Sequence, residues 1–320
     1  MRAAWYRRFA AAPATVLVAV LVAGCSDSGG EGGRGEPALG PVAVNPATVS
    51  ISLPMDAYTD SEAEAIRMGR VQESLVSQCM ARYGFTYEGV SSSESAAGGV
   101  SADRHAYLFG LADPAYAEAH GYDKTAGQGR PAKPQAPKLS GGAYTVMHGE
   151  QPGKERAPDA LNEEDAAKLD SGIEVGGQKV PAGGCGREGY RKLYAPTKDS
   201  VDLLFSFGLA GEAHDRSKAD SRVVEALHRW SACMDKSGYS GIKSPYEVIE
   251  KLGLESDLGG PKAVTAAKAD VACKREVNLV GIWAAVEKAY QERLVEEHAE
   301  TLALYKKQRE ARFRLAASLS

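Results

Sequence analysis

The chain has 320 residues, of which 43% are hydrophobic and 25% charged, and its formal net charge is −4. Removal of an N-terminal signal that holds Arg2, Arg7 and Arg8 leaves 35 basic and 42 acidic residues, a formal charge of −7. This balance excludes a protein that binds nucleic acid or anionic lipid through its whole surface.

Residues 1–24 are typical of a bacterial lipoprotein signal peptide. Three arginines precede an apolar core of roughly 10 to 14 residues, shorter than the ~20 needed to cross a bilayer. Val22-Ala23-Gly24-Cys25 closes this core and resembles the lipobox. The resemblance implies cleavage before Cys25 and a diacylglyceryl group on its sulfur, a lasting anchor because it has two acyl chains. The alternative is an ordinary signal peptide with an incidental cysteine.

Residues 25–57 are expected to form a flexible tether behind the lipidated cysteine. Gly, Ser and Glu dominate residues 26–36, and such a composition does not bury enough apolar surface to fold. Prolines continue the irregular stretch at positions 41, 46 and 54. About 30 residues of this kind span ~30 Å on average. No second apolar run follows, so the mature part is expected to be soluble apart from its lipid.

Four further cysteines, Cys79, Cys185, Cys233 and Cys273, follow in the mature part. An even number in an exported chain predicts two disulfides, although spacing alone allows three connectivities. The rival interpretation is a metal site, but the sequence has no Cys-x-x-Cys or His-x-x-x-His pair. We therefore expect no metal and no cofactor.

Two of these cysteines lie in matching helix ends. Cys79-Met80-Ala81-Arg82-Tyr83-Gly84-Phe85 and Cys233-Met234-Asp235-Lys236-Ser237-Gly238-Tyr239 share the order Cys-Met, three variable residues, Gly and an aromatic. Glycine suits the left-handed position after a helix, and the aromatic then folds back on the last turn. Apolar residues at helical spacing precede both endings, which predicts a helix from about Asp60 and a second one through Trp230.

The other two cysteines also match, as Cys185-Gly186-Arg187-Glu188 and Cys273-Lys274-Arg275-Glu276, each leading into a helical pattern. The match predicts a duplicated unit in which a helix-ending cysteine is bonded to one near the start of the next helix. Cys79 would then pair with Cys185, and Cys233 with Cys273. We place the first cysteine module at 58–195, with an insert at 88–184, and the second at 196–320.

The insert is expected to be irregular, with a short helix from Asp113-Pro114 to Gly121. Short strands are predicted at 143–147 and at 173–180, the latter as a Gly-Gly hairpin. From Pro261 to about Ala317 the only helix breaker is Gly281, so this stretch can form a rod of ~80 Å. The fold class is therefore mainly α: a disulfide-stapled helical domain with a long C-terminal helix and an irregular insert containing short β strands.

These features resemble a class of exported lipoproteins common in high-GC Gram-positive bacteria, chiefly filamentous actinomycetes. The resemblance extends over most of residues 60 to 280 and includes, besides the Cys-Met-x-x-x-Gly-aromatic endings, Phe109-Gly110-Leu111-Ala112-Asp113, His120-Gly121-Tyr122 and Pro181-Ala182-Gly183-Gly184-Cys185. It implies location and architecture and no activity.

The sequence contains no convincing catalytic motif. Ser240-Gly241-Ile242-Lys243 has the Ser-x-x-Lys spacing of penicillin-recognising acylases, but neither Lys-Thr-Gly nor Ser-Asp-Asn follows. The six histidines are scattered; His105, His120 and His148 share the insert, where they could form a small site with Asp113 or Glu150.

We expect a non-catalytic binding or accessory subunit, anchored through Cys25 on the outer face of the cytoplasmic membrane, with a membrane-protein or cell-wall partner and no nucleic acid. Leu302, Tyr305 and Phe313 on the distal terminal helix, and the basic residues of its last turns, are the expected partner surface. Two alternatives place a site in the insert: a cell-wall hydrolase, or a small-molecule-binding lipoprotein.

Overall fold

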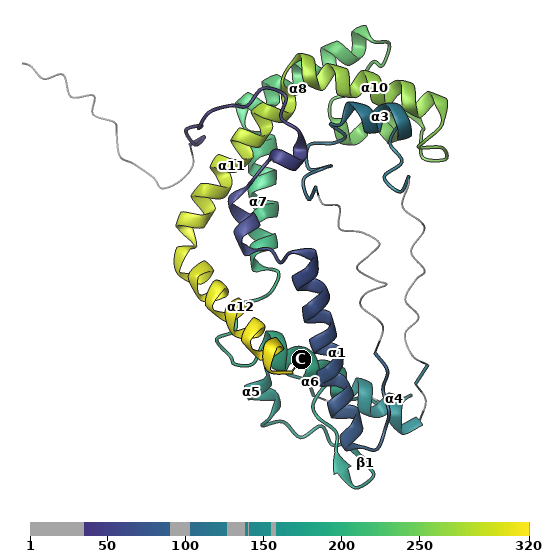
Figure 1. Ribbon diagram of the computed structural model, residues 1–320, viewed down its shortest axis with the longest axis vertical. Coiled ribbons are helices and arrows are strands. Elements are labelled where there is room, and N and C mark those ends of the chain that lie inside the picture. Colours follow the sequence, from purple (N-terminus) through teal and green to yellow (C-terminus); the bar gives the residue numbers. More distant parts are fainter. Residues whose placement is uncertain (1–34, 90–102, 127–137, 140, 155–157, 320) are drawn as a thin grey trace, which may run out of the picture. The chain divides into compact units, whose positions relative to one another are not determined.

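The structure is a computed structural model of the chain, and it describes residues 35–89, 103–126, 138–139, 141–154 and 158–319. Its elements belong to one unit, residues 37–320, and Figure 1 shows that nearly all of them are helices. In chain order they are η1 (Thr48–Ser50), η2 (Pro54–Tyr58), α1 (Glu62–Arg82), α3 (Pro114–His120), α4 (Gly141–His148), α5 (Glu163–Ala166), β1 (Glu174–Val175), β2 (Gln178–Lys179), α6 (Gly184–Tyr194), α7 (Phe205–Ala219), α8 (Ser221–Lys236), η3 (Pro245–Glu247), α9 (Val248–Leu252), α10 (Pro261–Glu276), α11 (Leu279–Glu297) and α12 (Ala299–Leu319). The predicted fold class is confirmed.

Both cysteine helices end on glycine, as the sequence predicts. In each, the glycine has a positive φ, +79° at Gly84 and +91° at Gly238. The amide of the following aromatic donates to a methionine carbonyl in the last turn, at 3.2 Å for Phe85 to Met80 and 2.9 Å for Tyr239 to Met234. The two endings are therefore the same local structure built twice.

The disulfides join the cysteines in the predicted pairs. Cys79 is bonded to Cys185 with a Cα–Cα distance of 5.5 Å, and Cys233 to Cys273 with one of 5.6 Å. The first bond fastens α1 to α6 and the second fastens α8 to α10, helices that also pack against each other.

The two ends of the insert pack on different cysteine modules. Its first helix, α3, lies on α10, whereas α4 lies on α6 and α1. The predicted strand at 143–147 is wrong, because these residues form α4 and bury Thr145 and Val146 against those helices. The Gly-Gly hairpin is confirmed: β1 pairs with β2 in antiparallel register, Glu174 opposite Lys179.

A buried polar network holds the first part of the insert in place. The Lys274 ammonium donates to the Asp270 carboxylate at 2.9 Å and to the Leu111 carbonyl at 2.7 Å. The same carboxylate accepts from the Tyr122 hydroxyl at 3.1 Å and from the Trp230 indole at 3.0 Å. Burial raises the pKa of Asp270 and lowers that of Lys274. Because every group has partners, this network is structural.

The C-terminal stretch is helical but not one continuous rod. Asn278 has φ +53° and separates α10 from α11, while His298 lies between α11 and α12. The rod expected from Pro261 is therefore wrong, since a left-handed residue interrupts the hydrogen bonding of a right-handed helix. The long C-terminal helix itself is present as α12, 21 residues long.

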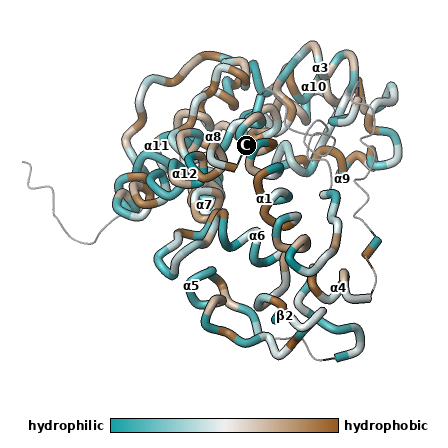
Figure 2. Tube along the Cα trace, turned by 60° about the horizontal axis from the view of Figure 1, so that its bottom comes forward, coloured by the Kyte–Doolittle hydropathy of each residue, from teal (hydrophilic) through white to brown (hydrophobic). Residues whose placement is uncertain are grey.

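The distal helix α12 belongs to the core of the protein. Leu302 is fully buried and Tyr305 is 4% exposed, and α12 packs on α1, α6, α11 and η2. In Figure 2 hydrophobic and hydrophilic residues alternate along the helices, as expected where one face of each is covered. The partner surface predicted on α12 is therefore wrong for these side chains.

The basic end of α12 is also engaged within the molecule. Arg309 pairs with Asp60 at 2.5 Å and with Glu64 at 2.8 Å. Arg312 is 5% exposed and lies over the rings of Tyr194 and Tyr305. These two arginines hold α12 onto the start of α1 and the end of α6.

Residues 37–47 form a strap that is fastened to the folded helices. Asn278 accepts from the Asn45 amide at 2.7 Å and donates to the Ala43 carbonyl at 3.0 Å. Farther along the strap, Arg222 donates to the Pro37 carbonyl at 3.0 Å. The predicted tether at 25–57 is therefore too long, because its second half from Pro37 is part of the fold.

The strap also explains why position 281 is glycine. A Cβ on Gly281 would lie 2.0 Å from the Ala43 carbonyl oxygen. Gly281→Ala is expected to displace the strap and to destabilise the protein by about 1–3 kcal/mol, measured by urea unfolding and by proteolysis within residues 37–47. Gly208→Ala is the control, since no atom lies within 4 Å of its Cβ position and alanine is the better helix former. Equal stability of the two variants would contradict the role of the strap.

The position of α12 in the core gives a second prediction. Leu302→Ala is expected to lower the free energy of unfolding by about 2–5 kcal/mol, because it leaves a cavity at a fully buried site. Leu304→Ala, on the same helix but 38% exposed, is expected to change it by less than about 0.5 kcal/mol. A small effect at both positions would contradict a core role for Leu302 and would support the predicted partner surface.

Candidate functional site

A cavity of about 420 Å³ lies among η2, the segment 103–108, α7 and α11. Its apolar wall consists of Leu53, Met55, Leu108, Phe207 and Ala210. Its charged and ionisable groups are Asp56, Asp60, Arg104, His105, His214 and Glu287. A mostly apolar hollow with a few convergent polar groups is the usual form of a small-molecule site.

His214 of α7 is at the centre of the polar groups. Its Nδ1 lies 3.1 Å from the Glu287 carboxylate, and its Nε2 lies 3.0 Å from the Tyr246 hydroxyl. The ring stacks on Trp283, with centroids 5.5 Å apart and planes within 5°. Both edges and one face of this imidazole are therefore fixed by the protein.

The Glu287 carboxylate is buried, with 1% of its side chain exposed. One oxygen accepts from the Ser217 hydroxyl at 2.8 Å, and the other accepts from the Gln291 amide at 2.9 Å. Gln291 in turn accepts from the Met55 amide at 3.0 Å, which fastens η2 to α11. The carboxylate thus sets the position of two walls of the cavity.

The Tyr246 hydroxyl closes the network. Its hydrogen is donated to the Leu108 carbonyl, and its oxygen lies 3.0 Å from His214 Nε2. Burial raises the pKa of Tyr246, and the negative charge of Glu287 adds to this.

This arrangement does not favour catalysis by His214. A histidine oriented by a carboxylate is a common general base. Here, however, Nε2 faces a phenol whose raised pKa makes it a poor nucleophile. We interpret the network as a fixed wall of the cavity.

A second histidine and carboxylate, His105 and Asp56, also line the cavity. His105 Nε2 lies 3.1 Å from Asp56, which also accepts from the Leu53 amide at 2.8 Å. Burial acts to raise the pKa of Asp56, but the hydrogen bonds from His105 and Leu53 and the charge of Arg104 bring it below its ordinary value. The Arg104 guanidinium is 3.5 Å from the same carboxylate, with 39% of its side chain exposed.

Helix α7 borders the cavity with two interior glycines, Gly208 and Gly211. Glycine in a helix interior costs about 1 kcal/mol relative to alanine. No atom lies within 4 Å of the Cβ position at either residue, so packing against the protein does not require them. Gly211 lines the cavity, where a missing side chain leaves room for a ligand.

The insert site expected from three histidines is not formed. His105 belongs to the cavity, whereas His120 ends α3 against Tyr116 and His148 ends α4 on the exposed side of Tyr144. The carboxylates are occupied separately, since Asp113 caps α3 and Glu150 accepts from the Tyr144 hydroxyl. Within the described ranges, no group of three or more His, Cys, Asp or Glu side chains could hold a metal ion.

The other candidate residues have simpler positions. Cys25 lies outside the described residues. Ser240 and Lys243 are exposed in the turns after α8. Lys243 borders a second hollow of about 410 Å³ with His228 and Asp235. The side chains of His228, Asp235 and Lys243 are exposed and no hydrogen bond joins them, so we prefer the first cavity.

Sequence analysis did not identify His214, Tyr246 or Glu287. Their separations of 32 and 41 residues follow no motif, and each lies in an ordinary helical or turn pattern. The two glycines of α7, which packing does not require, are the one feature of the sequence that points to this cavity.

Comparison with protein-family models, with curated proteins and with solved structures gives no match to this chain. Among the residues that the structure covers, no helix combines the length and the hydropathy needed to span a membrane.

The Asp56 network predicts a defined pH dependence. Asp56→Asn is expected to destabilise the protein at pH 7 by about 1–2 kcal/mol, because charged hydrogen bonds are lost at a partly exposed site. Since folding lowers the pKa of Asp56, its stabilisation is present above the ordinary carboxyl pKa of about 4 and is lost as the pH falls through the folded value.

The difference between wild type and Asp56→Asn should therefore shrink between pH 6 and pH 3 (approximate limits) in urea unfolding. Glu225→Gln, at an exposed position of α8, is the control and should show no such trend. A difference that stays constant with pH would show that Asp56 acts through packing alone.

Proposed function

We propose that this protein is a lipid-anchored, non-catalytic binding subunit of the cell envelope, and that it binds a small apolar ligand in the cavity beside α7. The observation that carries the proposal is the cavity of about 420 Å³, whose apolar wall adjoins Gly211 on an otherwise ordinary helix. A site of this size and lining is suited to ligand burial.

Binding is a better account of the cavity than chemistry. His214 and Glu287 are joined to each other and to neighbouring side chains, which fixes their geometry but leaves no activated nucleophile beside them. The hydrolase alternative depended on the insert, whose histidines lie on three separate elements. No observation favours it here.

The proposed location rests on the sequence. Val22-Ala23-Gly24-Cys25 resembles a lipobox, and the strap from Pro37 begins shortly after it. A diacylglyceryl group at Cys25 would hold the folded unit at the outer face of the cytoplasmic membrane. A membrane-protein or cell-wall partner belongs to the same proposal, with the cavity ligand as the substance that the complex handles.

Anchoring is tested by Cys25→Ala. The variant is expected to lack lipid label and to lose its place in the membrane fraction, because the acylated thiol is absent. Equal labelling of the variant and the wild type would contradict a lipid at this residue. The experiment does not involve the cavity, so its outcome is independent of ligand binding.

Ligand binding is tested by filling the cavity from α7. N-phenylnaphthylamine, an uncharged probe whose fluorescence rises in apolar surroundings, is expected to bind the wild type. Gly211→Leu is expected to weaken this binding at least about tenfold, because its side chain enters the cavity. Gly208→Leu, on the same helix and also without neighbours within 4 Å, is the control and should bind as the wild type does. Equal binding by both variants would place the probe elsewhere.

A further inference from the structure

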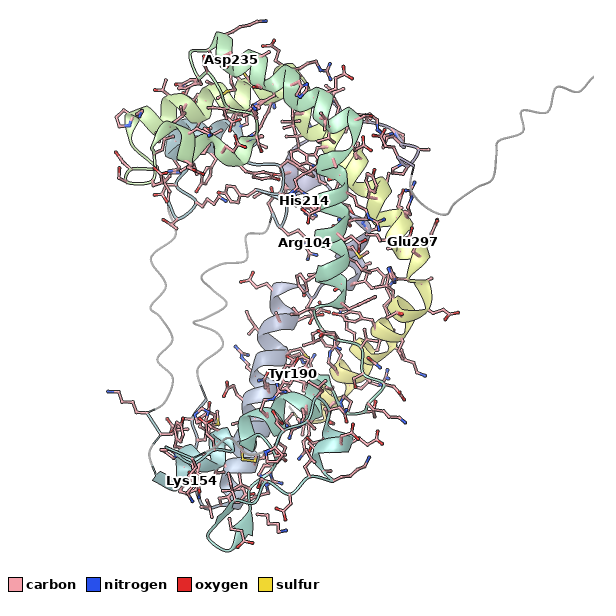
Figure 3. The ribbon with its side chains drawn as sticks, turned by 180° about the vertical axis from the view of Figure 1, so that it is seen from behind. Arg104, Lys154, Tyr190, His214, Asp235 and Glu297 are labelled. Atoms are coloured by element: carbon pink, nitrogen blue, oxygen red, sulfur yellow. A yellow bond between two sulfur atoms is a disulfide. The ribbon has the colours of Figure 1, made fainter. Side chains whose placement is uncertain are left out.

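We propose that the ligand of this cavity is a carboxylate amphiphile, a molecule with an apolar body and one carboxylate, and that Arg104 binds the carboxylate. The inference rests on the proposed function and adds the chemical class of the ligand. Figure 3 shows Arg104 and His214 in the same region of the molecule, and both line the cavity.

Arg104 has hydrogen-bond donors to spare. A guanidinium offers five N–H groups in a planar fork that matches a carboxylate. In the described part of the chain its one ion pair is with Asp56, at 3.5 Å, and it makes no hydrogen bond there. Its side chain is 39% exposed and contributes to the lining of the cavity, so the guanidinium is accessible to a ligand.

The other charged groups of the lining are already occupied. Asp60 pairs with Arg309, and Glu287 accepts from His214, Ser217 and Gln291. The Asp56 carboxylate accepts from His105 and from the Leu53 amide. These three carboxylates already accept hydrogen bonds or ion pairs within the protein, and Arg104 would repel a cationic head group.

The charged side chains of the lining also disfavour a ligand with more than one negative charge. Three carboxylates, those of Asp56, Asp60 and Glu287, line the cavity. Among the lining residues Arg104 is the one arginine and it already faces Asp56, so each further negative charge on the ligand adds to the repulsion from these carboxylates, which disfavours a phosphate with a charge near −2 more than a carboxylate. A carboxylate fits this field better than a phosphate does.

The apolar wall of the cavity indicates what kind of apolar body the ligand has. Leu53, Met55 and Leu108 supply an aliphatic surface, and Phe207, 57% exposed, stands among them on α7. A volume of about 420 Å³ corresponds to roughly a dozen water-sized groups. Contiguous apolar surface with an exposed phenyl ring is a common mark of a binding site.

The test compares three probes with one body and different head groups: decanoate, decanol and decylammonium, each competing with N-phenylnaphthylamine. In the wild type, decanoate should compete about tenfold more tightly than decanol, and decylammonium should be weakest. Arg104→Gln should remove the preference for decanoate while leaving decanol and the fluorescent probe unchanged. Arg229→Gln, at an exposed position of α8, removes the same charge elsewhere and should keep the preference.

The outcomes separate the two proposals. If the fluorescent probe binds and is lost in Gly211→Leu, but the three head groups compete equally or decylammonium competes best, the carboxylate class is wrong and the cavity function stands. If Arg104→Gln weakens decanol as much as decanoate, Arg104 packs against the body and does not recognise the head. If no probe binds the wild type, both proposals fail.

Discussion

The buried carboxylate of Glu287 holds together the walls of the cavity beside α7. It lies on α11 and is held by groups from α7 and from its own helix, and through Gln291 it fixes η2. An unpaired carboxylate in this position would be costly, so the histidine, hydroxyl and amide around it must all stay in place. Because these groups line or border the cavity, its walls are held in place as well. A site that is fixed before the ligand arrives loses less entropy on binding.

Disulfides and polar contacts hold the other parts of the molecule together. Each disulfide joins two packed helices across 106 or 40 residues and, in the chain-entropy model, contributes about 4–5 kcal/mol. The Asp270 network then fastens the insert to α8 and α10, and Arg309 fastens α12 to α1. The predicted repeat does not extend to its second half, because Cys185 is near the start of α6 whereas Cys273 is near the end of α10.

Some features of the cavity resemble a catalytic site, whereas others indicate binding. Its network of His214 and Tyr246 resembles the machinery of a hydrolase in composition, yet the hydroxyl beside the imidazole is a phenol with a raised pKa. Its glycines weaken α7 locally but leave space where a side chain would stand. Helix stability given up beside an apolar hollow is easier to explain by an occupant than by packing. Binding accounts for both observations with the same residues.

Elements whose causes are local could be predicted from the sequence. The helix endings at Gly84 and Gly238 and the Gly-Gly hairpin follow from backbone conformations that glycine favours, and the duplicated pattern gave the disulfide pairs. Tertiary structure alone decided that residues 143–147 are helical, that Asn278 interrupts the terminal helices, and that Leu302 is core. The cavity was likewise beyond sequence analysis, because His105, His214 and Glu287 are brought together by packing between helices. Their sequence separations reflect no repeating geometry, so periodicity and spacing could not reveal them.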